Sequence, residues 1–162
     1  MTATDELLSN AEGYASSFDK GDLPMPPGRH VAIVACMDAR LNPYGIFGLT
    51  EGDCHVIRNA GGAVTDDVIR SLAISQRLLG TQEVILVHHA DCGMRTFKSD
   101  DFANQIQEDT GVRPPWAGEA FPDSAADVRQ SMARITASPF LPNKDSVRGF
   151  VWDDKTGSLT EV

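Results

Sequence analysis

Three side chains that commonly bind transition metals follow two apolar segments of the chain. The sequence CMDAR begins at Cys36, directly after the apolar run 31–35, and HADC spans His89 to Cys92, shortly after the apolar run 84–87. Each run is typical of a buried strand, and in open α/β sheets functional groups gather beyond the carboxyl ends of the strands. Zinc favours cysteine sulfur and histidine nitrogen as ligands. We therefore predict one zinc ion per chain, bound by Cys36, His89 and Cys92.

Two neighbouring residues are alternative ligands. Cys54 begins a predicted strand of about five residues, which spans roughly 17 Å, so it should lie at the far edge of the sheet from the other ligands. We interpret Cys54 as a small buried residue. His88 and His89 should point to opposite faces of their strand, and the His-x-x-Cys spacing to Cys92 favours His89. His88 is then expected in the core or beside a ligand.

An aspartate and an arginine follow the first cysteine at intervals of two residues. Three protein ligands leave the fourth zinc position open to water or to Asp38. Arg40 is near enough to hold the Asp38 carboxylate ionised and oriented. Asp38 can then accept a hydrogen bond from zinc-bound water, whose pKa the metal brings down to about 7. The alternative is a solvated surface ion pair. We interpret Asp91 as an exposed loop carboxylate, with a contact to a ligand as the alternative.

A glycine-rich loop lies between the two clusters. The sequence RNAGG begins at Arg58 and leads toward a predicted helix over 65–79. A helix N-terminus favours anions, so Gly61 and Gly62 are candidate substrate-binding residues. The loop lacks the dinucleotide-binding fingerprint, which makes it a weak nucleotide signal.

The remaining pattern predicts an α/β fold with a central, mostly parallel sheet of four strands flanked by helices. A short antiparallel edge strand over 158–162 would follow the turn at 153–157. The predicted strands cover 30–36, 54–58, 83–89 and 147–152, and the predicted helices cover 65–79, 100–109 and 124–137, with a loop or short helix over 41–49 and a loop over 111–122.

The N-terminal part predicts a helical arm in front of the sheet. Residues 2–18 have apolar side chains near helical spacing, and a proline-rich segment at 23–28 separates them from the first strand. The helix either packs on its own sheet or lies across a partner subunit. We expect one domain over 1–162, with 1–28 as the arm.

Composition excludes several classes of partner. The chain of 162 residues has a net charge of −9, which argues against nucleic acid and anionic membranes as partners. We recognise no signal peptide and no apolar run of membrane-spanning length. Three cysteines in such a chain favour metal binding or free thiols over disulfides. We therefore expect a cytoplasmic protein.

Three motifs in this order resemble a β-class carbonic anhydrase of the compact, archaeal-type branch. The motifs are Cys36-x-Asp38-x-Arg40, then RNAG from Arg58, then His89-x-x-Cys92-Gly93. The resemblance implies reversible hydration of CO2 to bicarbonate and a proton, by zinc-bound hydroxide that an Asp-Arg dyad orients. It also implies a homodimer or larger homo-oligomer with active sites near the subunit interface.

The resemblance has departures and leaves alternatives. Plant-type members carry a glutamine where this chain has Thr50, and the glycine usually found before the metal-binding histidine is His88 here. Hydrolases of carbonyl sulfide or carbon disulfide resemble the same branch and share the metal chemistry. A non-catalytic zinc or redox-sensing module is a third class of function. The Asp38–Arg40 pair argues against that class, because a structural site does not need it.

Overall fold

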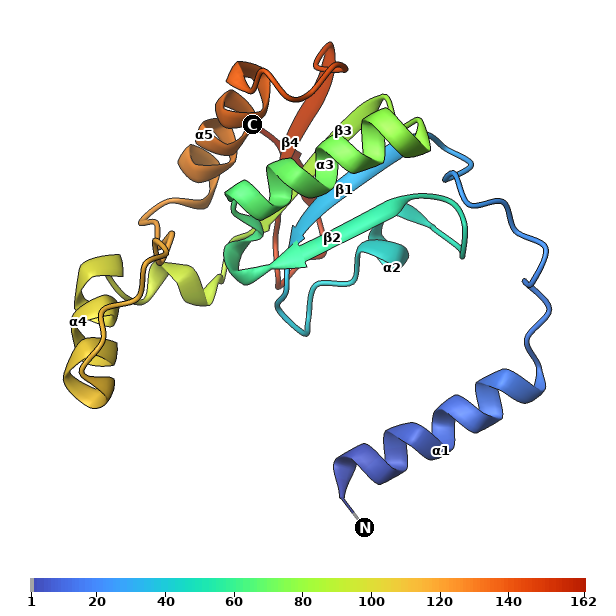
Figure 1. Ribbon diagram of the computed structural model, residues 1–162, viewed down its shortest axis with the longest axis horizontal. Coiled ribbons are helices and arrows are strands. Elements are labelled where there is room, and N and C mark those ends of the chain that lie inside the picture. The colour runs from blue at the N-terminus through green and yellow to red at the C-terminus, as the bar shows by residue number, and fades with distance from the viewer. Residues whose placement is uncertain (1) are drawn as a thin grey trace.

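A five-stranded sheet forms the centre of the computed structural model, which describes residues 2–162 (Figure 1). The strands are β1 (Val31–Cys36), β2 (His55–Asn59), β3 (Glu83–His89), β4 (Ser146–Trp152) and β5 (Leu159–Glu161). They lie in the order β2-β1-β3-β4-β5, with β1 to β4 parallel and β5 antiparallel to β4. This confirms the predicted α/β class, including the antiparallel edge strand.

The register of the sheet brings the ends of β1, β3 and β4 to one edge. Ala35 pairs with Arg58 of β2 and with Val87 of β3, and His89 pairs with Trp152 of β4. Because the strands are parallel, the segments that follow Cys36, His89 and Trp152 leave the sheet side by side. The two metal-binding clusters of the sequence therefore meet at this edge.

Local signals set the bounds of the helices. The helices are α1 (Ala3–Ser16), α2 (Pro43–Phe47), α3 (Asp66–Leu79), α4 (Ser99–Thr110) and α5 (Ser124–Ala137), with short 3-10 turns η1 (Ala60–Gly62) and η2 (Gly93–Arg95). Thr65 caps α3 by accepting a hydrogen bond from the Val68 N–H, and Gly80 ends it in a left-handed conformation. Asp123 caps α5 through the Ala126 N–H, at 2.7 Å. Both helices match their predicted bounds to within one residue.

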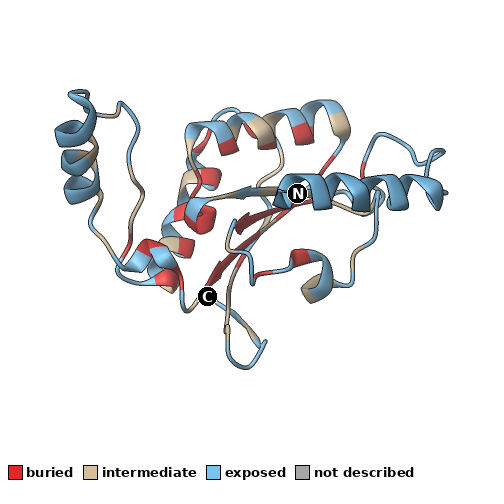
Figure 2. Cartoon of the chain, turned by 90° about the horizontal axis from the view of Figure 1, so that it is seen from below, coloured by how far each residue is buried: buried red, intermediate tan, exposed pale blue. Residues whose placement is uncertain are grey.

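Apolar side chains cover both faces of the sheet, which explains why its central strands are apolar along their whole length. Helices α3 and α5 pack on one face through fully buried residues such as Leu72 and Ile135, which join Val34 and Leu86 of the strands. The opposite face carries Ile33, Ala35 and Val87, together with Cys36 and Cys92. Figure 2 shows the buried strands between these layers.

The N-terminal helix stands apart from this core. Every residue of α1 is exposed, including Leu7 at 67% and Leu8 at 61%, and Figure 1 shows α1 away from the sheet. Its link to the rest of the chain includes a hydrogen bond of 3.1 Å from the Tyr14 hydroxyl to Glu51. The alternative in which this helix packs on its own sheet is therefore wrong. Within residues 2–162, no helix is long and apolar enough to cross a membrane.

Candidate metal centre

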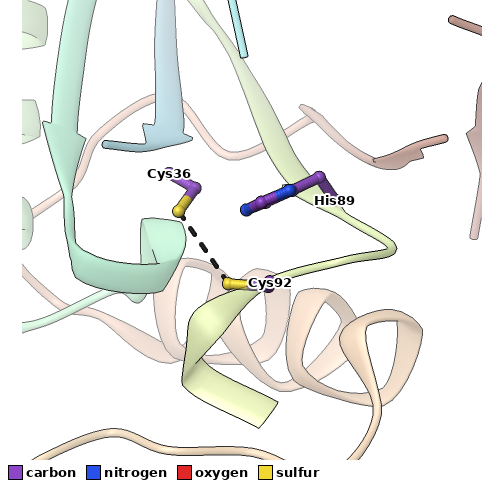
Figure 3. A group of neighbouring side chains, drawn as sticks. All are labelled: Cys36, His89 and Cys92. Atoms are coloured by element: carbon purple, nitrogen blue, oxygen red, sulfur yellow. Dashed lines mark hydrogen bonds between the residues drawn. The ribbon is translucent and has the colours of Figure 1, made fainter. Parts of the chain in front are cut away.

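Cys36, His89 and Cys92 converge at the carboxyl edge of the sheet (Figure 3). One ligand atom from each residue lies within 4.8 Å of the other two, and all three residues are buried. The two sulfurs are 3.9 Å apart. Cys36 ends β1, His89 ends β3, and Cys92 lies between β3 and η2. Residues 2–162 contain no other cluster of this kind.

The glycine-rich loop allows this approach because it passes close beneath Cys36. Gly62 has a φ of +69°, and a Cβ there would lie 2.9 Å from the Cys36 nitrogen and 3.1 Å from the Ala35 carbonyl carbon. Gly61 has a φ of +80°, and a Cβ there would lie 2.9 Å from Cγ of Met94. Only glycine fits both the left-handed backbone and the space at these positions. The role of Gly61 and Gly62 in binding substrate stays a prediction.

Arg58 fastens the segment that follows β1. Its guanidinium donates to three backbone carbonyls, those of Cys36 at 2.7 Å, Asp38 at 2.8 Å and Leu41 at 2.8 Å. The side chain thus gives hydrogen-bond partners to carbonyl groups of an irregular segment, two of which are partly buried and would cost free energy if left unpaired. In this structure Arg58 therefore supports the CMDAR segment.

The imidazole of His89 is oriented for metal binding. Its Nδ1 lies 2.7 Å from Oδ1 of Asp154, and Figure 3 shows the ring facing the two sulfurs. Its Nε2 is buried and has no hydrogen-bond partner among residues 2–162. A buried nitrogen without a partner is costly unless a ligand satisfies it. Two cysteines and this free nitrogen fit a zinc ion.

Hydrogen bonds within the cluster favour a thiolate. The contact with the Cys92 sulfur at 3.9 Å lowers the pKa of Cys36 to about 4; burial opposes this shift, and His89 adds to it. The same contact raises the pKa of Cys92. Burial by itself lowers the pKa of His89, but contacts with Cys36 and Asp154 outweigh it and raise the pKa to about 8. Since zinc binds the deprotonated groups, metal binding displaces the protons that this cluster holds.

The Asp38 carboxylate borders the cluster and is held by Arg40. Arg40 donates from Nε to Oδ1 at 2.9 Å, from Nη2 to Oδ2 at 2.8 Å and from its backbone N–H to Oδ1 at 2.9 Å. These bonds keep the pKa of Asp38 far below its usual range. Oδ2 of Asp38 lies 3.7 Å from Nε2 of His89. The carboxylate is thus ionised and beside the candidate ligands, while its bonds go to Arg40.

The alternative ligands lie elsewhere. Cys54 directly precedes β2 and lies outside the cluster. It is half-buried, whereas a buried residue was expected. His88 is fully buried on the α5 side, where its Nε2 lies 2.7 Å from Oδ2 of Asp127. Asp91 is the exposed loop carboxylate that the sequence indicates, with a side chain 74% exposed. Its carboxylate accepts a hydrogen bond of 2.8 Å from Nη1 of Arg40, which is not one of the three candidate ligands.

Asp154 is the contact that sequence reasoning missed. The sequence placed it in a turn after the last parallel strand, and the structure places its carboxylate on His89 and on the backbone N–H of Asp91, both at 2.7 Å. A signal was present, because a carboxylate just beyond the carboxyl end of a strand next to β3 can reach a ligand there. Its partner was not predictable from spacing alone.

Comparisons with known proteins agree with this site. A family model described as carbonic anhydrase matches residues 31–158. The chain is 62% identical to beta-carbonic anhydrase 1 of Mycobacterium tuberculosis, over 100% of this chain and 99% of that protein. The crystal structure of a carbonic anhydrase from Streptococcus mutans superposes with a TM-score of 0.92 at 40% identity, covering 100% of this chain and 98% of that one.

A related activity appears at lower similarity. A carbon disulfide hydrolase of Acidithiobacillus thiooxidans is 26% identical over 98% of this chain and 90% of its own length. The identity to this protein of a second named activity is far below that to beta-carbonic anhydrase 1. Taken together, the family match and the similarity across the full length show that this chain is a member of the carbonic anhydrase family, of the β class.

Proposed function

We propose that Cys36, His89 and Cys92 hold the zinc ion with which this carbonic anhydrase hydrates CO2 reversibly to bicarbonate and a proton. The observation that carries the assignment is the convergence of the three ligand atoms within 4.8 Å, beside a carboxylate that Arg40 holds in place. The free Nε2 of His89 supports it further. The donor set fits zinc, which prefers sulfur and imidazole nitrogen.

The residues around the ligands have separate roles in this proposal. A zinc ion bound there supplies the Lewis acidity that makes a water molecule nucleophilic near neutral pH. Asp38, ionised because of Arg40, accepts a hydrogen bond from the attacking water and orients it. Gly61 and Gly62 bring backbone close to the ligands, next to Met94, and we assign them to the wall against which the substrate binds. CO2 is linear and apolar, so it needs space and a fixed nucleophile more than charge.

The similarity favours CO2 over carbon disulfide as the substrate. The relative named a carbonic anhydrase is 62% identical over the whole chain, whereas carbon disulfide hydrolases are 26% identical over 98% of it or 39% identical over 67% of it. The Asp38–Arg40 pair also favours a catalytic site over a structural zinc module, because a structural site fills its fourth position with a protein atom.

The smallest active unit in this proposal is a homodimer. Apolar side chains of α1 lie open to solvent in the single chain, namely Leu7, Leu8, Tyr14 and Phe18. We propose that a second copy of the chain buries these side chains, because the proline-rich segment 23–28 directs α1 away from its own sheet. A cytoplasmic location agrees with three cysteines that are free thiols.

The test is a stopped-flow assay of CO2 hydration by the zinc-loaded protein, run beside a carbon disulfide hydrolysis assay. We expect C36S to lose both zinc and hydration. C54S makes the same chemical change outside the cluster, so it should keep both. Absence of CO2 hydration by the fully zinc-loaded protein would refute the function, and full zinc occupancy in C92S would refute the ligand assignment.

A further inference from the structure

The carboxylate of Asp154 is held at a defined place beside the metal centre. Its side chain is only 6% exposed. It follows β4, whose Trp152 lies opposite His89 in the sheet. The turn is stabilised by the preceding Asp153, whose Oδ1 accepts hydrogen bonds from the backbone N–H groups of Lys155 at 2.8 Å and Thr156 at 2.9 Å. The two neighbouring aspartates therefore differ in role: Asp153 stabilises the turn, and Asp154 points into the site.

The first oxygen of Asp154 determines which nitrogen of His89 is available. Oδ1 lies 2.7 Å from Nδ1 of His89. An ionised carboxylate can only accept, so Nδ1 carries the hydrogen and donates it. In the neutral imidazole the lone pair then resides on Nε2, the nitrogen that has no partner among residues 2–162 and that faces Cys36 and Cys92.

The second oxygen of Asp154 holds the loop that connects two ligands. Oδ2 accepts a hydrogen bond of 2.7 Å from the backbone N–H of Asp91, a residue that lies between His89 and Cys92 in the sequence. Asp91 in turn accepts two hydrogen bonds from Arg40, on its side chain at 2.8 Å and on its carbonyl at 3.0 Å. The carboxylate of Asp154 therefore contacts a ligand directly. It is linked to the Asp38–Arg40 pair through Asp91 and also lies 3.9 Å from Nη2 of Arg40.

We propose that Asp154 is a positioning residue of the metal centre, whose two oxygens fix the tautomer of His89 and the backbone between His89 and Cys92. The proposal rests on the zinc site described above. Partners of this kind behind a histidine ligand typically raise metal affinity by about 10–100-fold. The exposed Arg40–Asp91 contact is the weaker part of the link, because solvent screens it.

The experiment compares D154N with D153N, two identical changes in one turn. In D154N the amide group can accept only one of the two hydrogen bonds and directs an N–H group at the other donor. D153N keeps an acceptor for the turn. We expect D154N to lose about 10–100-fold in zinc affinity, measured by competition with a chromogenic chelator. The visible absorption spectrum of its cobalt-substituted form should also change, whereas D153N should match the unsubstituted protein in both measurements.

A measurement on the unsubstituted protein keeps the test decisive if D154N does not fold. In protein labelled with nitrogen-15 and loaded with cadmium-113, scalar coupling to the metal identifies the bound histidine nitrogen directly. Coupling to Nε2, with the hydrogen on Nδ1, is expected. Coupling to Nδ1 would overturn the proposal, and so would a folded D154N that holds zinc as tightly as D153N. A protein that binds zinc but does not hydrate CO2 would instead refute the proposed function and leave this comparison valid.

Discussion

Gly62 is the position at which a single methyl group should disturb the metal centre most. In G62A the new Cβ would lie 2.9 Å from the Cys36 nitrogen, 3.1 Å from the Ala35 carbonyl carbon and 3.3 Å from the Val87 carbonyl oxygen. All three atoms belong to the backbone of β1 or β3, so none can rotate away. The strand that carries the first ligand has to move by a few tenths of an ångström, or the loop does.

The substitution should lower the free energy of unfolding for two reasons, and a control variant separates them. A left-handed φ costs an alanine about 1–2 kcal/mol, and forcing a methyl into a packed site costs about 1–3 kcal/mol more. Gly157 has a similar φ of +72° but nothing within 4 Å of a Cβ. G157A therefore carries the conformational cost alone, and both variants gain the same small benefit of about 0.4–1 kcal/mol from a stiffer unfolded chain. The difference between them should be about 1–3 kcal/mol.

Thermal unfolding of the metal-free proteins measures this difference at matched protein concentration. At about 2–4 °C for each kcal/mol in a chain of this size, G62A should melt about 2–12 °C below G157A. G61A should fall between them, because the nearest atom there is Cγ of the flexible Met94 side chain. Equal melting temperatures for G62A and G157A would show that a methyl group at position 62 does not press on the backbone of Cys36.

Three further outcomes follow from the site and the arm. R40A should keep its zinc, yet its rate of CO2 hydration should fall about 100-fold, because Asp38 is no longer held in place. The control is R148A, which removes the exposed Arg148–Glu161 ion pair and should leave the hydration rate unchanged. L8E should shift the protein toward monomers in sedimentation runs, and S9E should not; a dimer that survives L8E would contradict the role of α1. Removing zinc that was present at 1,000 times its Kd should lower the free energy of unfolding by about 4 kcal/mol, read as a fall in the melting temperature.

The sequence predicts most of the sheet because its signals are local. The apolar run of β3 and the polar residues on either side mark its bounds, and the predicted strand 83–89 is the observed one. Thr65 and Gly80 mark the ends of α3 through caps that depend only on neighbouring backbone. Cys36, His89 and Cys92 were brought together for the same reason, since strand ends of a parallel sheet meet at one edge.

The contacts that escaped prediction join segments distant in the sequence. Asp154 and His89 are 65 residues apart, and their contact depends on how β4 pairs with β3 and on the path of one turn. Residue types do not encode that register by themselves. The placement of α1 is a second example. Its amphipathic pattern predicts that one face of the helix is buried, but it does not predict which surface buries that face.

The adjacent histidines show why the site needs partners on both sides of the sheet. His88 and His89 have the same side chain, and a slip of β3 by one residue would exchange their faces. Each has its own carboxylate: Asp127 of α5 lies 2.7 Å from Nε2 of His88, and Asp154 lies 2.7 Å from Nδ1 of His89. A slip in either direction would put one histidine in the place of the other and move the second away, so only one of the two carboxylates would keep a histidine partner. These two buried contacts therefore select one register of β3, and in that register His89 is the histidine that faces Cys36.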